Sequence, residues 1–126
     1  MIDEYAPDDS DSAGRLTNVA HIEGLLQNLA REGRAVGYSE MLLMLGLRFS
    51  RPKMRSLCRT MDEVDRRAAA AGQPELAALV VRESDKLPGQ GWWIGRTDYQ
   101  GKWTGPAARA FLNAIQQRSF DYWSKR

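Results

Sequence analysis

The sequence predicts a mainly α-helical domain with a small β-hairpin, arranged as a winged helix-turn-helix with an added C-terminal helix. Three observations lead to this prediction. Apolar residues recur at helical spacing in three segments before residue 72. Two short runs of β-branched and aromatic residues then flank a turn-rich segment at residues 85–91. A last helical pattern follows Pro106.

The first two helices are marked by caps and apolar spacing. We predict a helix over residues 17–32, with Thr17 or Asn18 as its cap and Gly33 at its end. The segment "RAVGY" that follows is expected to form a brief strand. A short, heavily buried helix is then predicted after Ser39, ending at residue 46.

The third helix carries both an apolar face and a basic stripe. It is predicted to start near Pro52, which is tolerated only in a first turn, and to fade before Gly72 and Pro74. At 100° per residue, one side collects Met54, Leu57, Met61, Val64 and Ala68. A stripe about 130° away collects Arg51, Arg55, Arg59 and Arg66.

The remaining chain predicts the hairpin and the last helix. "LAALVVRES" and "WWIG" are interpreted as the two strands, joined by "DKLPGQG". A helix over residues 105–122 follows, with Phe111, Leu112, Ile115, Ser119 and Tyr122 on one face.

Length and composition favour one domain. The 126 residues suit a single core, with 43% hydrophobic and 27% charged residues. One cysteine, Cys58, excludes an internal disulfide and, with the single His21, the usual zinc sites, so we expect no metal and no cofactor. No apolar run reaches about 20 residues and the N-terminus is acidic, so we expect a cytoplasmic protein without a membrane span.

Charge is distributed unevenly. The formal net charge is +2, from 18 basic and 16 acidic residues, and five of the acids lie in the first twelve residues. The rest therefore carries 18 minus 11, or +7. We interpret residues 1–14 as a disordered acidic tail and residues 15–126 as the domain. The tail is expected to aid solubility, with the alternative that it covers a basic surface and weakens non-specific polyanion binding.

The basic stripe predicts contact with double-stranded DNA. In a winged helix-turn-helix the second helix of the pair lies in the major groove, and the hairpin touches the flanking backbone. The stripe has no acid nearby in sequence until Asp62, and like charges four residues apart repel by roughly 0.2–0.5 kcal/mol. The alternative is an ordinary solvated face. The candidate DNA-binding residues are Arg48, Arg51, Lys53, Arg55, Ser56, Arg59 and, on the wing, Lys86.

Residues 34–89 resemble a known family. "AVGYSEMLLMLGL" followed by "RSLCRTM" is similar to the C-terminal DNA-binding domain of alkylguanine alkyltransferases and alkyltransferase-like proteins, with Tyr38 at the family's tyrosine. The resemblance implies that Arg55 enters the base stack as a nucleotide flips out, and that the preferred DNA is distorted or damaged. The family's reactive Pro-Cys-His-Arg-Val motif would fall on residues 76–80, which contain no nucleophile. Alkyl transfer is therefore excluded, and we expect no enzymatic activity.

Other reactive-looking residues have ordinary interpretations. Cys58 is expected to be a buried, unreactive thiol, because no histidine lies near it in sequence. The carboxylates at positions 62, 63 and 65 are interpreted as ion-pair partners of Arg59, Arg66 and Arg67, not as a nuclease metal site.

The aromatic residues leave a second function open. Trp92 and Trp93 are predicted on opposite faces of a strand, so that at most one belongs to the core. With Tyr38 they are candidates for base stacking or partner contact. The alternative function is a protein-interaction module that docks through the tryptophan-bearing hairpin and the C-terminal helix.

Overall fold

A computed structural model of the chain describes residues 13–126. The mainly helical class predicted from the sequence is confirmed, with a small two-stranded sheet. The elements are α2 (Val19–Arg31), β1 (Val36–Gly37), α3 (Tyr38–Met44), α4 (Arg51–Ala70), the 3-10 turn η2 (Ala77–Leu79), β2 (Val80–Val81), α5 (Gln90–Trp93) and α6 (Gly105–Trp123). The predicted tail lies outside the described residues up to position 12, while residues 13–16 form a helical turn.

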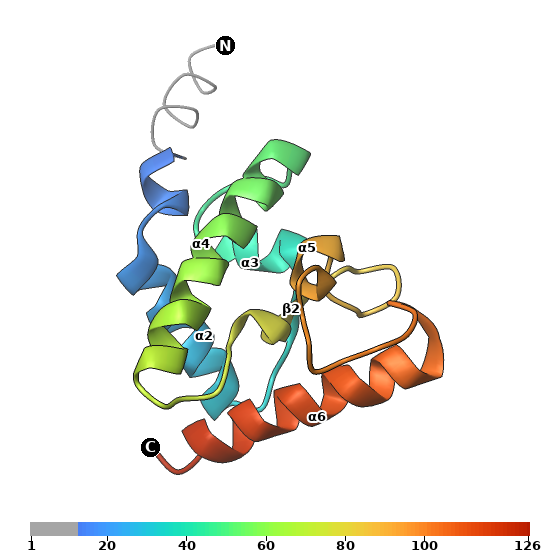
Figure 1. The fold of residues 1–126 in the computed structure, drawn as a ribbon. Helices are drawn as coiled ribbons and strands as arrows, with labels where there is room; N and C mark the ends of the chain where they lie inside the picture. Colours follow the sequence, from blue (N-terminus) through green and yellow to red (C-terminus); the bar gives the residue numbers. More distant parts are fainter. Residues whose placement is uncertain (1–12) are drawn as a thin grey trace.

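Helices α2 and α4 pack together to form the main core (Figure 1). Asn18 caps α2 by accepting a hydrogen bond from the His21 N–H, and Ser50 caps α4 by accepting from the Lys53 N–H. Pro52 lies in the first turn of α4, as predicted. The buried faces are the apolar stripes expected from the sequence. They contain Ile22, Leu26, Leu29, Leu57, Met61 and Val64.

The predicted β-hairpin is wrong. β2 pairs in parallel with β1, in the register Val36 with Val80 and Gly37 with Val81. Both residues of β2 are buried, so the strand lies inside the domain and not on an exposed wing. Residues 90–93, which include the start of the second predicted strand, form the short helix α5 instead.

Helix α6 covers a second apolar cluster. Its buried residues Ala108, Leu112 and Ile115 pack with Leu87 and Trp93. Figure 1 shows α6 running along the side of the molecule opposite the N-terminal end of α4. The N-terminal half of α4 is therefore left uncovered by the added helix.

None of the helices found between residues 13 and 126 combines the length and the apolar character needed to cross a bilayer.

Candidate nucleic-acid interface

A row of exposed arginines follows α4. Arg51, Arg55 and Arg59 are spaced by four residues, which places them in one stripe along the helix. Arg48 is exposed in the segment before the helix. Within residues 13–126, none of these four side chains forms an ion pair. Their charges are therefore not neutralised by the described part of the protein.

The acidic residues of α4 have different interaction partners. Glu63 pairs with Arg66 at 2.5 Å, as predicted. Arg67 pairs instead with Glu23 of α2, at 3.3 Å. Asp65 accepts hydrogen bonds from the backbone N–H groups that open η2. The predicted pairing of Arg59 with these acids is not observed among the described residues, so Arg59 remains part of the exposed row.

The row borders a groove with a volume of about 760 Å³. One wall is α4, which contributes the three arginines of the row together with Met54, Cys58 and Asp62. The opposite wall consists of residues 82–84 and 89–91, and we call these two stretches the far wall. Phe49 lines the groove from the segment that precedes α4.

The far wall is held by local polar contacts. Arg82 donates to the Asp85 carboxylate at 2.7 Å, and Asp85 also accepts from the Leu87 N–H at 3.1 Å. The Arg82 contact holds the pKa of Asp85 below its ordinary value. Arg109 of α6 donates to the Asp85 carbonyl. Lys86 is exposed at the tip of this loop, in a left-handed conformation with φ of 61°, but it does not line the groove.

A second set of contacts ties the far wall to α3. Glu83 accepts a hydrogen bond from the Ser39 N–H at 3.0 Å, which satisfies a free donor at the start of the helix. This contact needs Gly37, because a Cβ at that position would clash with the Glu83 carboxylate. The far wall therefore has a fixed position relative to α3 although no hairpin forms.

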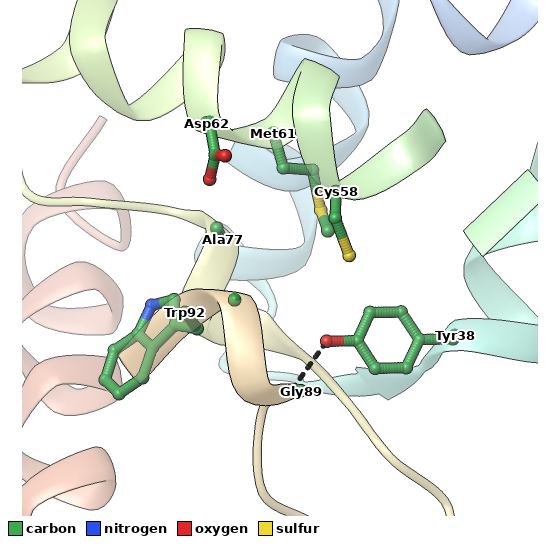
Figure 2. A pocket seen from close by; sticks show the side chains of 8 residues that line it. Tyr38, Cys58, Met61, Asp62, Ala77, Gly89 and Trp92 are labelled. Carbon is green, nitrogen blue, oxygen red and sulfur yellow. Dashed lines mark hydrogen bonds between the residues drawn. The ribbon is translucent and has the colours of Figure 1, made fainter. Parts of the chain in front are cut away.

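Tyr38 and Cys58 lie at the bottom of the groove, above a small cavity of about 50 Å³ (Figure 2). The Tyr38 hydroxyl accepts a hydrogen bond from the Gly89 N–H at 2.8 Å. Burial raises the pKa of Tyr38 and that of the Cys58 thiol above their ordinary values. Both groups are therefore neutral at pH 7. Cys58 is half-buried, not fully buried as the sequence predicted, and has little thiolate character.

Tyr38 is only 3% exposed, so its ring forms part of the floor and offers no free face for stacking. Lys53 and Ser56 are half-buried on α4 beside the arginine row. The Lys53 ammonium donates to the Arg48 carbonyl at 3.3 Å. Of the predicted DNA contacts, the structure thus brings together those on and just before α4 and leaves Lys86 outside the groove.

The two tryptophans lie in the short helix α5, so the prediction that they point to opposite faces of a strand is wrong, although only Trp93 belongs to the core, within the predicted limit of one. Trp93 is buried and donates its indole N–H to the Pro88 carbonyl at 3.2 Å. Trp92 is half-buried and donates to Glu75 at 3.1 Å. The Arg96 guanidinium lies 4.0 Å from the Trp92 ring centroid. Both indoles are therefore engaged by the protein itself, and the hairpin on which the alternative docking function rested is absent from the described residues.

Sequence reasoning left most of the groove lining without a binding role, and Arg82 and Phe49 are the two largest side chains among the residues it missed. Arg82 was hidden because its segment was interpreted as a strand. Phe49, with 47% of its surface exposed, was left without a role. The sequence does contain a signal for Phe49. It lies between Arg48 and the capping Ser50, at the position where an apolar residue often precedes a helix.

The lining of the groove is mixed in charge. Three arginines and Asp62 lie on the α4 wall, Glu83 lies on the far wall, and Tyr38 and Cys58 form the floor. Among residues 13–126 no group of three or more His, Cys, Asp or Glu side chains is placed to hold a metal ion. Comparison of the chain with protein-family models, with curated proteins and with solved structures finds no match.

Proposed function

We propose that the protein is a non-enzymatic DNA-binding protein in which α3 and α4 act as a helix-turn-helix pair. The observation that carries this proposal is the arginine row of α4 together with Arg48, which precedes the helix. All four side chains are exposed and form no ion pair with the described residues. An α-helix fits the major groove of B-DNA, which is about 12 Å wide. Successive arginines of α4 are about 6 Å apart along the helix axis, so they reach successive phosphates or base edges.

The start of α4 adds to this attraction. Its aligned peptide dipoles favour an anion at the N-terminus of the helix. The backbone contributes few donors there, because Pro52 has no N–H and the Lys53 N–H already donates to Ser50. A phosphate near the N-terminus of α4 is therefore expected to be held mainly by the Arg51 side chain.

The far wall is the proposed second contact with the DNA, in the absence of a β-hairpin wing among the described residues. It lies across the groove from α4 and carries Arg82, with Lys86 on the adjoining loop. In the proposed complex this loop lies against the DNA backbone that flanks the site of α4. The proposed preference is for distorted or damaged duplex, because the sequence resemblance to the alkyltransferases aligns Arg55 with the arginine that enters the base stack in that family.

Salt-dependent binding to a labelled duplex tests the proposal. Each phosphate contact contributes about 0.9 to the slope of log K against log salt. Replacing Arg55 and Arg59 together by Ala is expected to reduce the slope by about 2 and to weaken binding at least about tenfold at low salt. The matched control replaces Arg118 of α6 and Lys125, both exposed, by Ala, which removes the same charge from outside the groove and away from the α4 stripe.

The control double variant is expected to bind nearly as tightly as the wild type. Binding that does not depend on salt, or that weakens equally in both double variants, would show that the groove arginines are not the contact surface.

A further inference from the structure

The segment between α3 and α4 leaves one aromatic ring uncovered. Leu45 and Leu47 alternate into the core, with 5% and 1% exposure, whereas Phe49 remains 47% exposed. The segment itself is anchored, because the Arg15 guanidinium donates to the Leu45 and Gly46 carbonyls at 3.1 and 3.2 Å. The exposure of Phe49 is therefore a property of a fixed part of the fold.

The position of Phe49 relative to α4 is also set. It directly precedes the capping Ser50, the position from which an apolar residue commonly packs on the fourth helical residue, here Met54. Both residues line the same groove. The exposed surface of the Phe49 ring therefore lies at the groove, beside the first turns of α4.

The surroundings of the exposed face are cationic. Arg48 and Arg51 flank Phe49 in sequence, and Arg55 lines the groove one helical turn further along α4. A ring of this kind beside a row of arginines is the combination that binds unpaired DNA, in which a cationic groove follows the phosphates and an aromatic side chain stacks on a base. A base pair inside a continuous stack has no free face to offer to such a ring.

We infer that the Phe49 ring stacks on a nucleobase that is unpaired or unstacked, and thereby gives the groove a preference for DNA with an interrupted helix. This inference rests on the proposed DNA-binding function and adds to it the residue that recognises the exposed base. The phosphates on either side of that base lie along Arg48 and Arg51, which leaves Arg55 for the base stack.

The simpler role for Phe49 is to fix the start of α4 and nothing more. An aliphatic side chain can fulfil the first role, the apolar contact at the helix start, but cannot stack on a base. Leucine keeps the apolar contact at the helix start but lacks a flat face, whereas tryptophan keeps the flat face. Phe49→Leu and Phe49→Trp therefore separate stacking from helix capping.

Two labelled probes of the same sequence complete the test: a perfect duplex, and the same duplex with one unpaired adenine bulged from one strand. Wild type is expected to bind the bulged probe about fivefold to a hundredfold more tightly, the range that one base–aromatic stack supplies. Phe49→Leu is expected to bring this ratio close to one, because it weakens binding to the bulged probe more than binding to the perfect duplex. Phe49→Trp is expected to keep the preference.

A preference that survives in Phe49→Leu, that is absent from the wild type, or that is lost in Phe49→Trp would overturn the stacking role and leave the salt-dependent groove binding intact. Failure of the wild type to bind either probe would overturn the proposed function as well. If Phe49→Leu does not fold, the wild-type protein is titrated instead into a bulged probe that carries 2-aminopurine as its unpaired base. Quenching of its fluorescence in the complex supports the stack, and unchanged fluorescence contradicts it.

Discussion

The hydroxyl of Tyr38 accepts a hydrogen bond from the backbone N–H of Gly89 at 2.8 Å, and so joins the first residue of α3 to the far wall of the groove (Figure 2). The next residue of the helix, Ser39, makes the other link by donating its N–H to Glu83. The first turn of α3 therefore positions the far wall opposite α4. This dependence leads to predictions for the residues that make the links.

Replacement of Tyr38 by Phe removes only the hydroxyl and leaves the Gly89 N–H without its acceptor. We expect a loss of about 1 kcal/mol in the free energy of unfolding, measured in urea. DNA affinity is expected to fall a few-fold, with an unchanged salt slope, because the arginines remain in place while the far wall loosens. Tyr99→Phe is the control, since the Tyr99 hydroxyl donates to the Lys102 carbonyl away from the groove. An equal loss of DNA affinity in both variants would contradict the role of Tyr38.

Two glycine replacements are expected to act in opposite directions. Gly37→Ala displaces the Glu83 carboxylate and removes its hydrogen bond to Ser39, at a cost of about 1 kcal/mol. Gly24→Ala lies within α2, where a Cβ meets no atom within 4 Å, and is expected to stabilise the protein by roughly 0.5–1 kcal/mol. Thermal unfolding of the two variants measures both effects. A stabilised Gly37→Ala protein would show that the Glu83 contact contributes nothing.

Arg96 is expected to be a major stabilising residue outside the groove. Its guanidinium donates to both oxygens of Glu75, at 2.9 and 2.8 Å, and lies over the Trp92 ring. The side chain is 14% exposed. Arg96→Ala leaves a partly buried carboxylate unpaired, and we expect a loss of about 2–4 kcal/mol. Arg96→Lys is expected to recover little, because an ammonium cannot make the two parallel bonds or the same stacking contact.

Arg34 provides the comparison for Arg96. It also contacts two carboxylates, Glu32 and Glu40, but its side chain is 48% exposed. Arg34→Ala is therefore expected to cost clearly less stability than Arg96→Ala in the same urea experiment. Equal losses for the two arginines would show that burial and the Trp92 contact do not strengthen the Arg96 pair.

Asp65 is expected to make stability depend on pH. Burial raises its pKa from 3.8 to about 6, against the opposing effect of hydrogen bonds from the Leu76 and Ala77 N–H groups. The folded protein then binds this proton more tightly than the unfolded chain does, so the free energy of unfolding rises as pH falls. We expect a rise of roughly 1 kcal/mol between about pH 7 and pH 5. Asp85 and Asp98 have lowered pKa values, so their opposite contribution is lost only at more acidic pH.

Asp65→Asn provides the control for this pH effect. The amide oxygen can accept the same two backbone hydrogen bonds but does not titrate. Urea unfolding of this variant is expected to give nearly equal free energies at the two pH values. A variant that keeps the full pH dependence of the wild type would assign the effect to another group.

The helices could be predicted from the sequence because local signals agree with the fold. In α4 these signals are the apolar spacing, the Ser50 cap and Pro52 in the first turn, all of which lie within or directly beside one helix. The strand partner could not be predicted in the same way. Val80 and Val81 form a short buried run whose pairing with Val36 is decided by tertiary packing over more than 40 residues.

The candidate site was predicted in part for the same reason. The arginine row depends only on the periodicity of α4, so Arg51, Arg55 and Arg59 fall on one stripe as expected. The far wall depends on long-range contacts such as that between Tyr38 and Gly89, which no local pattern reveals. The tryptophans were misassigned because their interior packing is set by α6, through contacts such as that of Trp92 with Phe111.

An NMR titration of the protein with a short duplex tests the central claim most directly. We predict that the largest shifts, at low salt, fall on the side-chain Nε–H groups of Arg51, Arg55 and Arg59 and on the backbone of residues 48–59 and 82–91. We also predict that residues 105–123 of α6 shift little. Shifts concentrated on α6 or on residues 94–104, with the α4 arginines unchanged, would contradict the account.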